Sequence, residues 1–336
     1  MNTLAAADRV EVLVLVDNVT DNLSSVPAGV ETELSRFWRR GARLMAGSSL
    51  CCAAHGLSCA VTVQRGEVTR TLLFDTGPDA EVFQRNADRL GFDLGCIDGL
   101  MLSHGHWDHA GAMLRALDLA QLRNGGRAVP TYMHPGMYRR RAMRRPDGAL
   151  LPFDEVPDAR TLEHHGARVV HATQAQVVLD DLFFISGEIP RVTAFEQGLP
   201  GQVRRLDDDR GDDSDVSGWE PDPLLMDERF LAVRVHGRGL LVFTACSHAG
   251  VVNVLTHARA CFPGEPLLGV LGGLHLAGST EVAIPATVDA LRAFDLKTIA
   301  AGHCTGWRAL NALAGAFGDA VVPSTVGKTY RFERAG

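Results

Sequence analysis

Three histidines and one aspartate lie close together in the stretch SHGHWDHAGA, residues 103–112. His104 and His106 are two residues apart, so both rings leave an extended strand end on the same side. The chain is then expected to turn, so that Asp108 and His109 face the same point from the start of a helix. Imidazole and carboxylate groups are good ligands for zinc and also for iron or manganese. The stretch therefore predicts a metal site, and its four groups could supply parts of two adjacent sites.

The segments on either side of this stretch are apolar and would hold it in place. Residues 99–102 are typical of a short strand that ends at the histidines, and residues 110–122 are typical of a helix. Gly105 lets the backbone bend, and Gly111 lets the helix pack closely. The alternative is a polar surface loop that carries histidines by chance, but such a loop would not need an apolar element on both sides.

The rest of the chain alternates short apolar strands with helices. Strands are predicted at 10–16, 60–63, 71–74, 129–133, 230–235, 240–243, 267–271 and 298–301, and helices at 31–45, 80–90, 251–260, 281–294 and 305–317. Strand pairs come early in the chain, and strand–helix units come later. This order predicts an α/β fold whose sheets are covered by helices. We expect a single domain over residues 1–336, with insertions near residues 20–50, 136–165 and 200–222.

Two charged segments interrupt this pattern. Residues 138–145 carry five closely spaced arginines, and residues 206–215 carry six aspartates. The aspartate run is expected to be a solvated loop. The arginines could hold a phosphate or another anionic group of a substrate, but a solvated basic segment is the simpler interpretation and the one we favour.

Composition argues against several classes of protein. The net charge of −7 does not favour nucleic acid as a partner. Seven cysteines without a C-x-x-C pair argue against a disulfide framework or a structural zinc ribbon, and indicate a reducing compartment. No apolar run approaches the roughly 20 residues that span a bilayer, and the N-terminus is not typical of a signal peptide. We therefore expect a cytoplasmic protein with neither nucleic-acid nor membrane partners.

The histidine stretch resembles the H-x-H-x-D-H signature of the metallo-β-lactamase superfamily. Supporting motifs follow in the expected order: LFDTG at 73–77, FTACSH at 243–248 and AGHCTG at 301–306. A narrower set resembles the branch that contains the dihydropterin–ribofuranosylaminobenzene-phosphate synthase of methanopterin biosynthesis. Its motifs are HGLS at 55–58, SGEIPR at 186–191, CSH at 246–248, GGLHL at 272–276 and HCTG at 303–306. The resemblance covers most of the chain.

This resemblance implies an αββα sandwich, in which two mixed β-sheets are flanked by helices. It also implies one or two divalent metal ions, with zinc expected first and iron or manganese open. His104, His106 and a later histidine would hold one ion. The other ion would be held by Asp108, His109 and His303. Asp75 would lie behind the ligands and accept a hydrogen bond that orients one of them.

The middle of the chain departs from the pattern of the superfamily. Many members carry a histidine in a G-H-T-P-like turn and then an aspartate that bridges the two metals, and neither motif is plain here. We favour His248 as the missing histidine, because it ends a strand and precedes a helix. Cys246 stands at about the place of the bridging aspartate, and Glu188 and Asp227 are the other possible donors.

These residues lead to a metal-dependent hydrolase as the main hypothesis. It would use a metal-bound hydroxide on an ester- or phosphoester-type small molecule. Asp108 would orient the nucleophile as well as bind metal, and His275 would protonate the leaving group. His275 could equally be a hydrogen-bonded turn histidine. Two alternatives remain: an enzyme that transfers a pterin to an aryl riboside phosphate, and a non-catalytic metal-stabilised ligand sensor.

Overall fold

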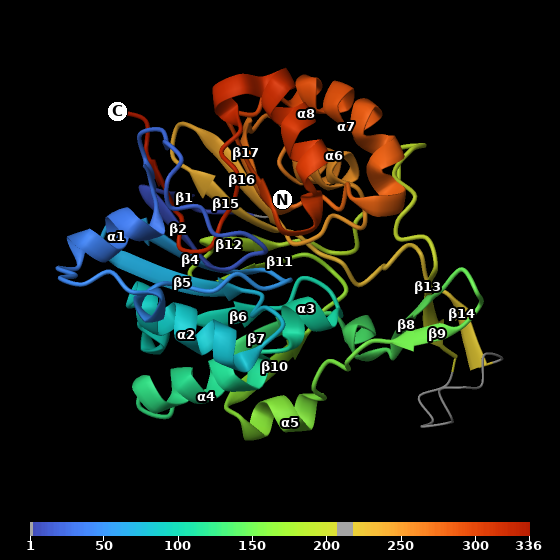
Figure 1. The fold of residues 1–336 in the computed structure, drawn as a ribbon, viewed down its shortest axis with the longest axis horizontal. Coiled ribbons are helices and arrows are strands. Elements are labelled where there is room, and N and C mark those ends of the chain that lie inside the picture. The colour runs from blue at the N-terminus through green and yellow to red at the C-terminus, as the bar shows by residue number, and fades with distance from the viewer. Residues whose placement is uncertain (1–2, 207–217) are drawn as a thin grey trace.

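The computed structural model describes residues 3–206 and 218–336 of the chain, and Figure 1 shows how their helices and strands are arranged. Two large sheets face each other in the middle of the molecule, and helices cover the outer side of each. A third, smaller sheet projects from one end. The acidic run predicted at residues 206–215 falls, apart from its first residue, outside the described residues.

The first large sheet has eight strands within the described residues, in the order β10-β7-β6-β5-β4-β2-β19-β3. Their bounds are β10 (Ala167–His171), β7 (Val129–Met133), β6 (Gly99–Met101), β5 (Val68–Phe74), β4 (Ser58–Arg65), β2 (Arg9–Val16), β19 (Thr329–Glu333) and β3 (Val30–Glu31). The four strands from β10 to β5 run parallel. The carboxyl ends of β5 and β6, where the chain enters the D-T-G motif and the histidine stretch, therefore lie at the same edge.

The second large sheet has the order β11-β12-β15-β16-β17-β18, and β1 pairs with β15. Their bounds are β11 (Gln176–Val178), β12 (Phe183–Ile185), β15 (Leu231–Val235), β16 (Gly239–Thr244), β17 (Leu267–Gly273), β18 (Thr298–Gly302) and β1 (Ala6–Ala7). The strands β16, β17 and β18 are parallel. Each is followed by one of the later histidine motifs, so these motifs are also delivered to one edge.

The small third sheet is built from two separate parts of the chain. Its order is β14-β13-β8-β9. The bounds are β14 (Trp219–Pro221), β13 (Gln202–Arg205), β8 (Arg141–Arg144) and β9 (Leu150–Pro152). Ala142, Val203 and Trp219 form its own small buried cluster. Figure 1 shows this sheet at the side of the molecule where α3, which belongs to the histidine stretch, follows the first sheet.

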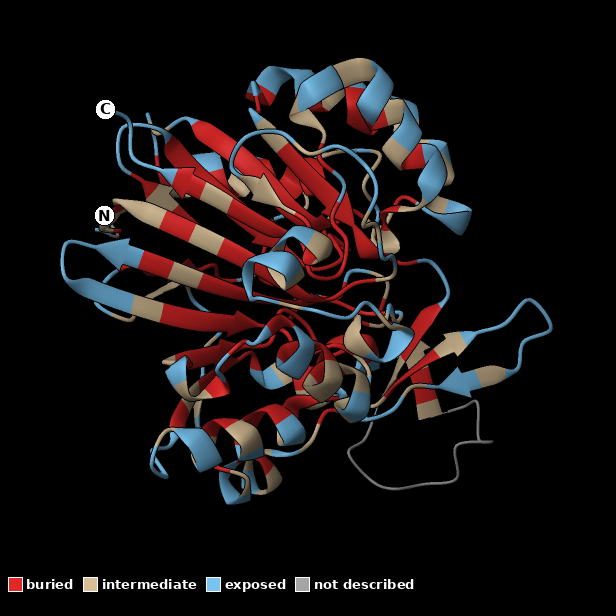
Figure 2. Cartoon of the chain, turned by 60° about the vertical axis from the view of Figure 1, so that its left-hand side comes forward, coloured by how far each residue is buried: buried red, intermediate tan, exposed pale blue. Residues whose placement is uncertain are grey.

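Helices complete the sandwich on both sides. They are α1 (Glu33–Arg39), α2 (Ala80–Leu90), α3 (Trp107–Ala110), α4 (Met113–Arg123), α5 (Ala159–His164), α6 (Val251–Cys261), α7 (Ile284–Leu291) and α8 (Trp307–Phe317). The helices α2, α4 and α5 pack on the first sheet, and α6, α7 and α8 pack on the second. A separate core lies between the two sheets, with the rings of Phe74 and Phe243 6.3 Å apart. Figure 2 shows the buried strands between exposed helix faces. The predicted αββα sandwich is confirmed.

Local chemistry explains where the helices begin and end. The carboxylate of Asp79 accepts hydrogen bonds from the first amides of α2, and Gly91 ends that helix in the left-handed conformation at φ 61°. The helix predicted at 110–122 corresponds to α4, which begins at Met113, while Ala110 is the last residue of the short helix α3. Gly111 lies between them against Pro78, where a Cβ atom would be only 2.0 Å from a backbone oxygen. This close contact fixes the start of α4 beside the D-T-G loop.

Three predicted elements differ from the structure. The helix expected at 31–45 is only α1, capped by Thr32 and ended at Arg40. The helix expected at 281–294 has its α-helical part at α7 and 3-10 turns on both sides. The favoured interpretation of residues 138–145 as a solvated segment is wrong for Arg141, which is buried and lies in β8. Among the described residues, no helix has the length and apolar character needed to cross a bilayer.

Candidate metal centre

The predicted site residues meet at one edge of the sandwich, immediately after the strands that deliver them. Asp75 follows β5, and the histidine stretch follows β6. Cys246 and His248 follow β16, while His275 and His303 follow β17 and β18. Carboxyl ends of strands from both sheets thus supply one site.

The backbone at these strand ends is unusual. Asp75, Ser247, His275 and His303 have φ values of 56°, 57°, 41° and 49°. Non-glycine residues rarely adopt this left-handed region, because the Cβ atom is crowded there. Each such residue costs on the order of 1–3 kcal/mol, and such residues cluster at functional sites. Their position around one point is independent support for a site at this edge.

Three buried histidines form the first ligand group: His104, His106 and His248. Single ring nitrogens from the three lie within 4.8 Å of one another. Nε2 of His104 is 3.0 Å from Nδ1 of His106, and the ring of His248 is 4.9 Å from each of the other two, centroid to centroid. The structure therefore places His248 where a third histidine ligand is needed, although its binding of metal stays a prediction.

The second ligand group consists of Asp108, His109, His303 and Cys246, again with one donor atom each within 4.8 Å of the others. Oδ2 of Asp108 lies 3.4 Å from Nε2 of His109 and 3.3 Å from Nε2 of His303. Sγ of Cys246 lies 3.3 Å from Nε2 of His109. Cys246, Glu188 and Asp227 are the three candidates for the place of the bridging aspartate. Of these, only Cys246 belongs to either ligand group.

Asp75 lies behind the second ligand group. Its Oδ2 is 2.8 Å from Nδ1 of His109 and accepts a hydrogen bond from the Ser103 hydroxyl at 2.7 Å. Its Oδ1 accepts from the Ser103 backbone N–H at 2.7 Å. The Ser103 hydroxyl is also 2.9 Å from Nδ1 of His104. Asp75 can therefore orient one ligand directly and a second through Ser103, which agrees with the role expected from its resemblance.

Three further residues that could orient the histidines were not recognised from the sequence. Oε1 of Gln202, in β13, is 2.6 Å from Nε2 of His106. Oδ1 of Asn18 is 3.0 Å from Nδ1 of His303, and Asp17 accepts a hydrogen bond from the His303 backbone N–H at 2.9 Å. Asp17 and Asn18 are visible in the sequence only as the end of a strand. Gln202 has no local motif at all.

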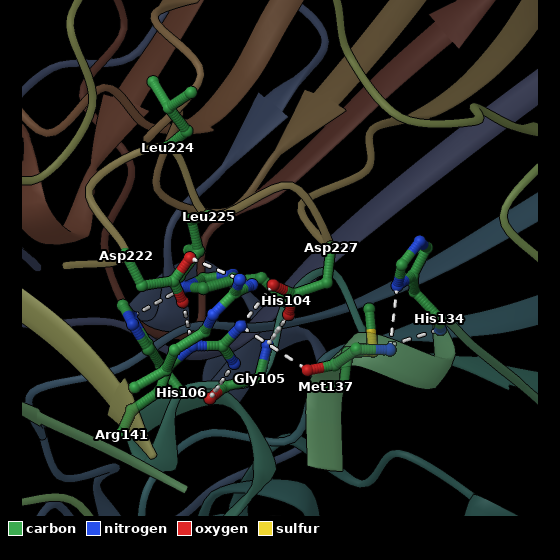
Figure 3. A network of polar contacts seen from close by, with 12 residues as sticks. His104, Gly105, His106, His134, Met137, Arg141, Asp222, Leu224, Leu225 and Asp227 are labelled. Carbon is green, nitrogen blue, oxygen red and sulfur yellow. Dashed lines mark hydrogen bonds and ion pairs between the residues drawn. The ribbon is translucent and has the colours of Figure 1, made fainter. Parts of the chain in front are cut away.

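The remaining two candidate donors have other partners. Oδ2 of Asp227 accepts a hydrogen bond from the Gly105 backbone N–H at 2.9 Å, and Arg141 donates to Asp227 and to the Gly105 carbonyl oxygen. Figure 3 shows this buried network, which Asp222 completes with a 3.1 Å contact to Arg141. Glu188 is 3.2 Å from Nε2 of His134. Asp227 therefore holds the loop between His104 and His106 instead of joining the ligand groups.

Burial keeps the first ligand group neutral. It lowers the pKa of His104 and His248 well below the ordinary value, and it lowers the pKa of His106 to about 4. Neutral imidazole is the form that binds metal ions. Burial raises the pKa of Asp108, but His109 and His303 outweigh it and hold the pKa well below its usual value. Near neutral pH the carboxylate is thus ionised and able to bind a cation.

The buried atoms of both groups fit a divalent cation. Both ring nitrogens of His248 are buried without a hydrogen-bond partner among the described residues. Buried polar atoms in folded proteins nearly always have a partner. Imidazole, carboxylate and thiol donors around these atoms are the ligands that zinc prefers. The residues present therefore fit the metal that the fold implies.

His275 lies beside the first ligand group, with its ring 4.5 Å from that of His248. It lines a cavity of about 520 Å³ above both ligand groups. Burial lowers its pKa, but Cys304 and then Glu228 outweigh that effect and raise it above the ordinary value. Trp107, Met143, Phe153 and Leu199 form apolar parts of the cavity wall.

This fold and arrangement define a class of protein. The chain is similar to the metallo-β-lactamase superfamily, whose family model matches residues 56–216. The fold is also that of a solved structure described as a metal-dependent hydrolase of the beta-lactamase superfamily. That structure has a TM-score of 0.67 and 21% sequence identity, and the match covers 97% of this chain and all of the other.

Curated relatives narrow the resemblance. The chain is 26% identical over 280 residues to a 7,8-dihydropterin-6-methyl-4-(beta-D-ribofuranosyl)-aminobenzene-5'-phosphate synthase of Methanocaldococcus jannaschii. That match covers 83% of this chain and 90% of the relative. An uncharacterized protein of the same organism is 25% identical over 262 residues, with 78% and 88% of the two chains covered. The predicted resemblance to the superfamily and to this branch is confirmed.

Proposed function

We propose that the protein is a metal-dependent hydrolase that acts on an ester- or phosphoester-type small molecule. The observation that carries this proposal is the pair of adjacent ligand groups below a cavity of about 520 Å³. A cavity of this size suits a small-molecule substrate. A divalent metal held there would lower the pKa of water toward neutrality and polarise the oxygen of the bond to be cleaved.

The chain's own residues would prepare the reactants. His104, His106 and His248 would hold one cation, and Asp108 and His303 would help to hold a second. Asp108 is ionised, and its Oδ2 atom lies close to His109 and His303. Its remaining lone pairs can accept a hydrogen bond from the attacking water and so orient it. The oxygen of water would bond to the acyl carbon or phosphorus as the bond to the leaving oxygen breaks.

His275 would supply the proton that the leaving oxygen needs. Its imidazole lines the cavity beside the first ligand group, and its raised pKa favours the protonated form needed for this step. Trp107 and Phe153, which also line the cavity, would limit the access of bulk water to the reacting bond.

Zinc is the metal that we propose first, because the donors combine imidazole, carboxylate and thiol. We also propose a small-molecule substrate instead of nucleic acid, in line with the net charge of −7. The free cysteines of the described residues support the proposed reducing, cytoplasmic setting.

Metal analysis tests the centre and an ester panel tests the reaction. We expect His106→Ala and His248→Ala to lose most of the bound metal and at least 100-fold in kcat/KM. His164→Ala, in α5 and outside both ligand groups, is the control and should keep both. Metal content unchanged in His106→Ala would contradict the proposed centre. A fully loaded wild type that hydrolyses no ester, thioester, lactone or phosphoester would contradict the reaction.

One observation favours a second candidate function. The relative that is 26% identical over most of both chains is named as a synthase. We therefore keep a group-transfer reaction, in which an aryl riboside phosphate would be joined to a pterin, as the alternative. Product analysis by mass spectrometry with both substrates separates the two: a joined product supports the synthase, and cleavage of a simple ester in their absence supports the hydrolase.

A further inference from the structure

A second cavity lies directly beside the one above the ligand groups. It measures about 170 Å³ and shares His248, His275 and Ser279 with the larger cavity. Because the same three residues line both, the two cavities adjoin at these side chains. A molecule whose reacting bond lies over the ligand groups would pass His275 and Ser279 to place one arm in the smaller cavity.

The walls of this smaller cavity are mainly apolar. Their apolar side chains are Phe195, Val251, Leu274, Leu276, Val282 and Ala283. Three of these, at positions 251, 274 and 276, are buried, whereas Val282 is 85% exposed and can form the entrance. An apolar cavity of about 150 Å³ is large enough to bind benzene. The smaller cavity thus matches a phenyl ring or a short acyl chain in size and polarity.

The charges around the smaller cavity disfavour an anionic arm of the substrate. Within the described parts of the chain, neither cavity is lined by lysine or arginine. Glu196 lines the smaller cavity, where its carboxylate accepts hydrogen bonds from the backbone N–H groups of Val252 and Asn253, 2.8 Å each, and caps α6. A phosphate in this cavity would meet the Glu196 carboxylate, with neither lysine nor arginine to pair with it.

The arginines of residues 138–145 do not supply a positive charge to either cavity. Arg139 and Arg141 line a different cavity of about 340 Å³, together with His134 and Glu188. Arg141 is moreover paired with two buried carboxylates, those of Asp222 and Asp227. Arg141, which also donates to the Gly105 carbonyl oxygen in the histidine stretch, therefore has a structural role.

We propose that the smaller cavity binds an uncharged apolar arm of the substrate, of the size of a phenyl ring or a short acyl chain. This rests on the proposed hydrolase function and narrows it. The substrate is an ester-type molecule that carries such an arm, and an arm that ends in a phosphate or carboxylate is excluded. Ser279 and Ala283 then determine how large the arm can be.

Two substitutions test this binding site without changing a ligand residue. Ala283→Trp fills the smaller cavity, and Ser279→Trp, at an exposed position, narrows the passage between the cavities. Val192→Trp is the matched control, because Val192 is 65% exposed and lines neither cavity. The probe is benzyl alcohol, whose binding to the metal-loaded protein is measured by ligand-observed NMR. We expect at least a tenfold higher Kd in both cavity variants and no change in the control.

Kinetics provide the second measurement. Ethyl phenylacetate should have a kcat/KM about tenfold or more above that of ethyl acetate in the wild type, and the ratio should fall to within about twofold in both cavity variants. Should Ala283→Trp fail to fold, the exposed Ser279→Trp still decides the outcome. Benzyl alcohol binding that is unaffected in the folded cavity variants overturns the proposal, as does a wild-type kcat/KM for ethyl phenylacetate that is no higher than that for ethyl acetate. If benzyl alcohol binding follows the variants but no ester is hydrolysed, the binding site is supported and the hydrolase function is overturned.

Discussion

Nδ1 of His109 lies 2.8 Å from Oδ2 of Asp75, and both side chains are completely buried. The contact joins the end of β5 to the start of α3, so one carboxylate links the D-T-G motif to the histidine stretch. A carboxylate in this position fixes the ring of the histidine with Nε2 turned toward Asp108 and Cys246. Such partners raise the basicity of a ligand and hold its orientation.

Asp75→Asn should therefore weaken metal binding without removing any proposed ligand. We expect the affinity for zinc, measured by competition with a chelator, to fall by about 10- to 100-fold. Asp289→Asn, at a side chain that is 81% exposed, is the control and should leave the affinity unchanged. Equal affinities of Asp75→Asn and the wild type would show that this contact does not act on the metal centre.

Cys246 should bind metal through its thiolate, because its Sγ atom lies among the donors of the second ligand group. In protein loaded with cobalt(II), we expect a near-ultraviolet thiolate-to-cobalt absorption that Cys246→Ser abolishes. Cys96→Ser, at an exposed cysteine, should retain it. Cys304→Ser provides the contrasting test, since Cys304 lines the same cavity. An absorption that persists in Cys246→Ser and is lost in Cys304→Ser would assign the bound thiolate to the other cysteine.

The buried pair Arg141–Asp227 should contribute strongly to stability. Asp227→Asn leaves the guanidinium of Arg141 with one fewer carboxylate, and we expect the free energy of unfolding to fall by about 3–5 kcal/mol at pH 7. Asp180→Asn is the control, because Asp180 pairs with Arg70 at the surface, where such pairs contribute about 1 kcal/mol or less. Equal losses in the two variants would contradict the structural role of the network.

The same pair predicts a pH dependence. Burial raises the pKa of Asp227, but Arg141 outweighs it and the pKa lies below the ordinary value. A depressed pKa stabilises the folded state above the unfolded-state value of about 3.9, and this stabilisation is lost as the pH falls through the folded-state value. The difference in unfolding free energy between wild type and Asp227→Asn, measured in urea, should thus be constant near neutrality and shrink below about pH 4. A difference that grows on acidification would contradict this.

Two glycine substitutions should have opposite effects on stability. In Gly111→Ala, the new Cβ atom would lie 2.0 Å from the Pro78 backbone oxygen, so we expect a loss of at least about 1–3 kcal/mol. Gly315 is exposed near the end of α8, with nothing within 4 Å of the corresponding position. Gly315→Ala should therefore leave the stability unchanged or raise it by up to about 1 kcal/mol. Thermal unfolding of the two variants provides the measurement, and a neutral Gly111→Ala would show that α3 and the D-T-G loop can separate.

The sequence by itself determined the part of the site that is local. His104, His106, Asp108 and His109 fall within one strand–turn–helix segment, so their spacing alone predicts that they share a site. The apolar pattern also predicted α2 and nine of the nineteen strands of the described residues, because burial on one face imposes a period on the sequence. Both depend on residues that are near neighbours along the chain.

The motifs named His248, His303 and Cys246 as candidates, but only the tertiary structure brought them beside that segment. His248, Cys246 and Asn18 reach it because β16 and β2 lie in different sheets whose ends meet at one edge, and strand order is not encoded in any local motif. Gln202 reaches His106 through the small third sheet. The packing also decided that Arg141 is buried and that the cavity beside His275 is apolar. Burial by distant segments depends on which surfaces the whole fold brings together, whereas a hydrophobic period depends only on near neighbours along the chain.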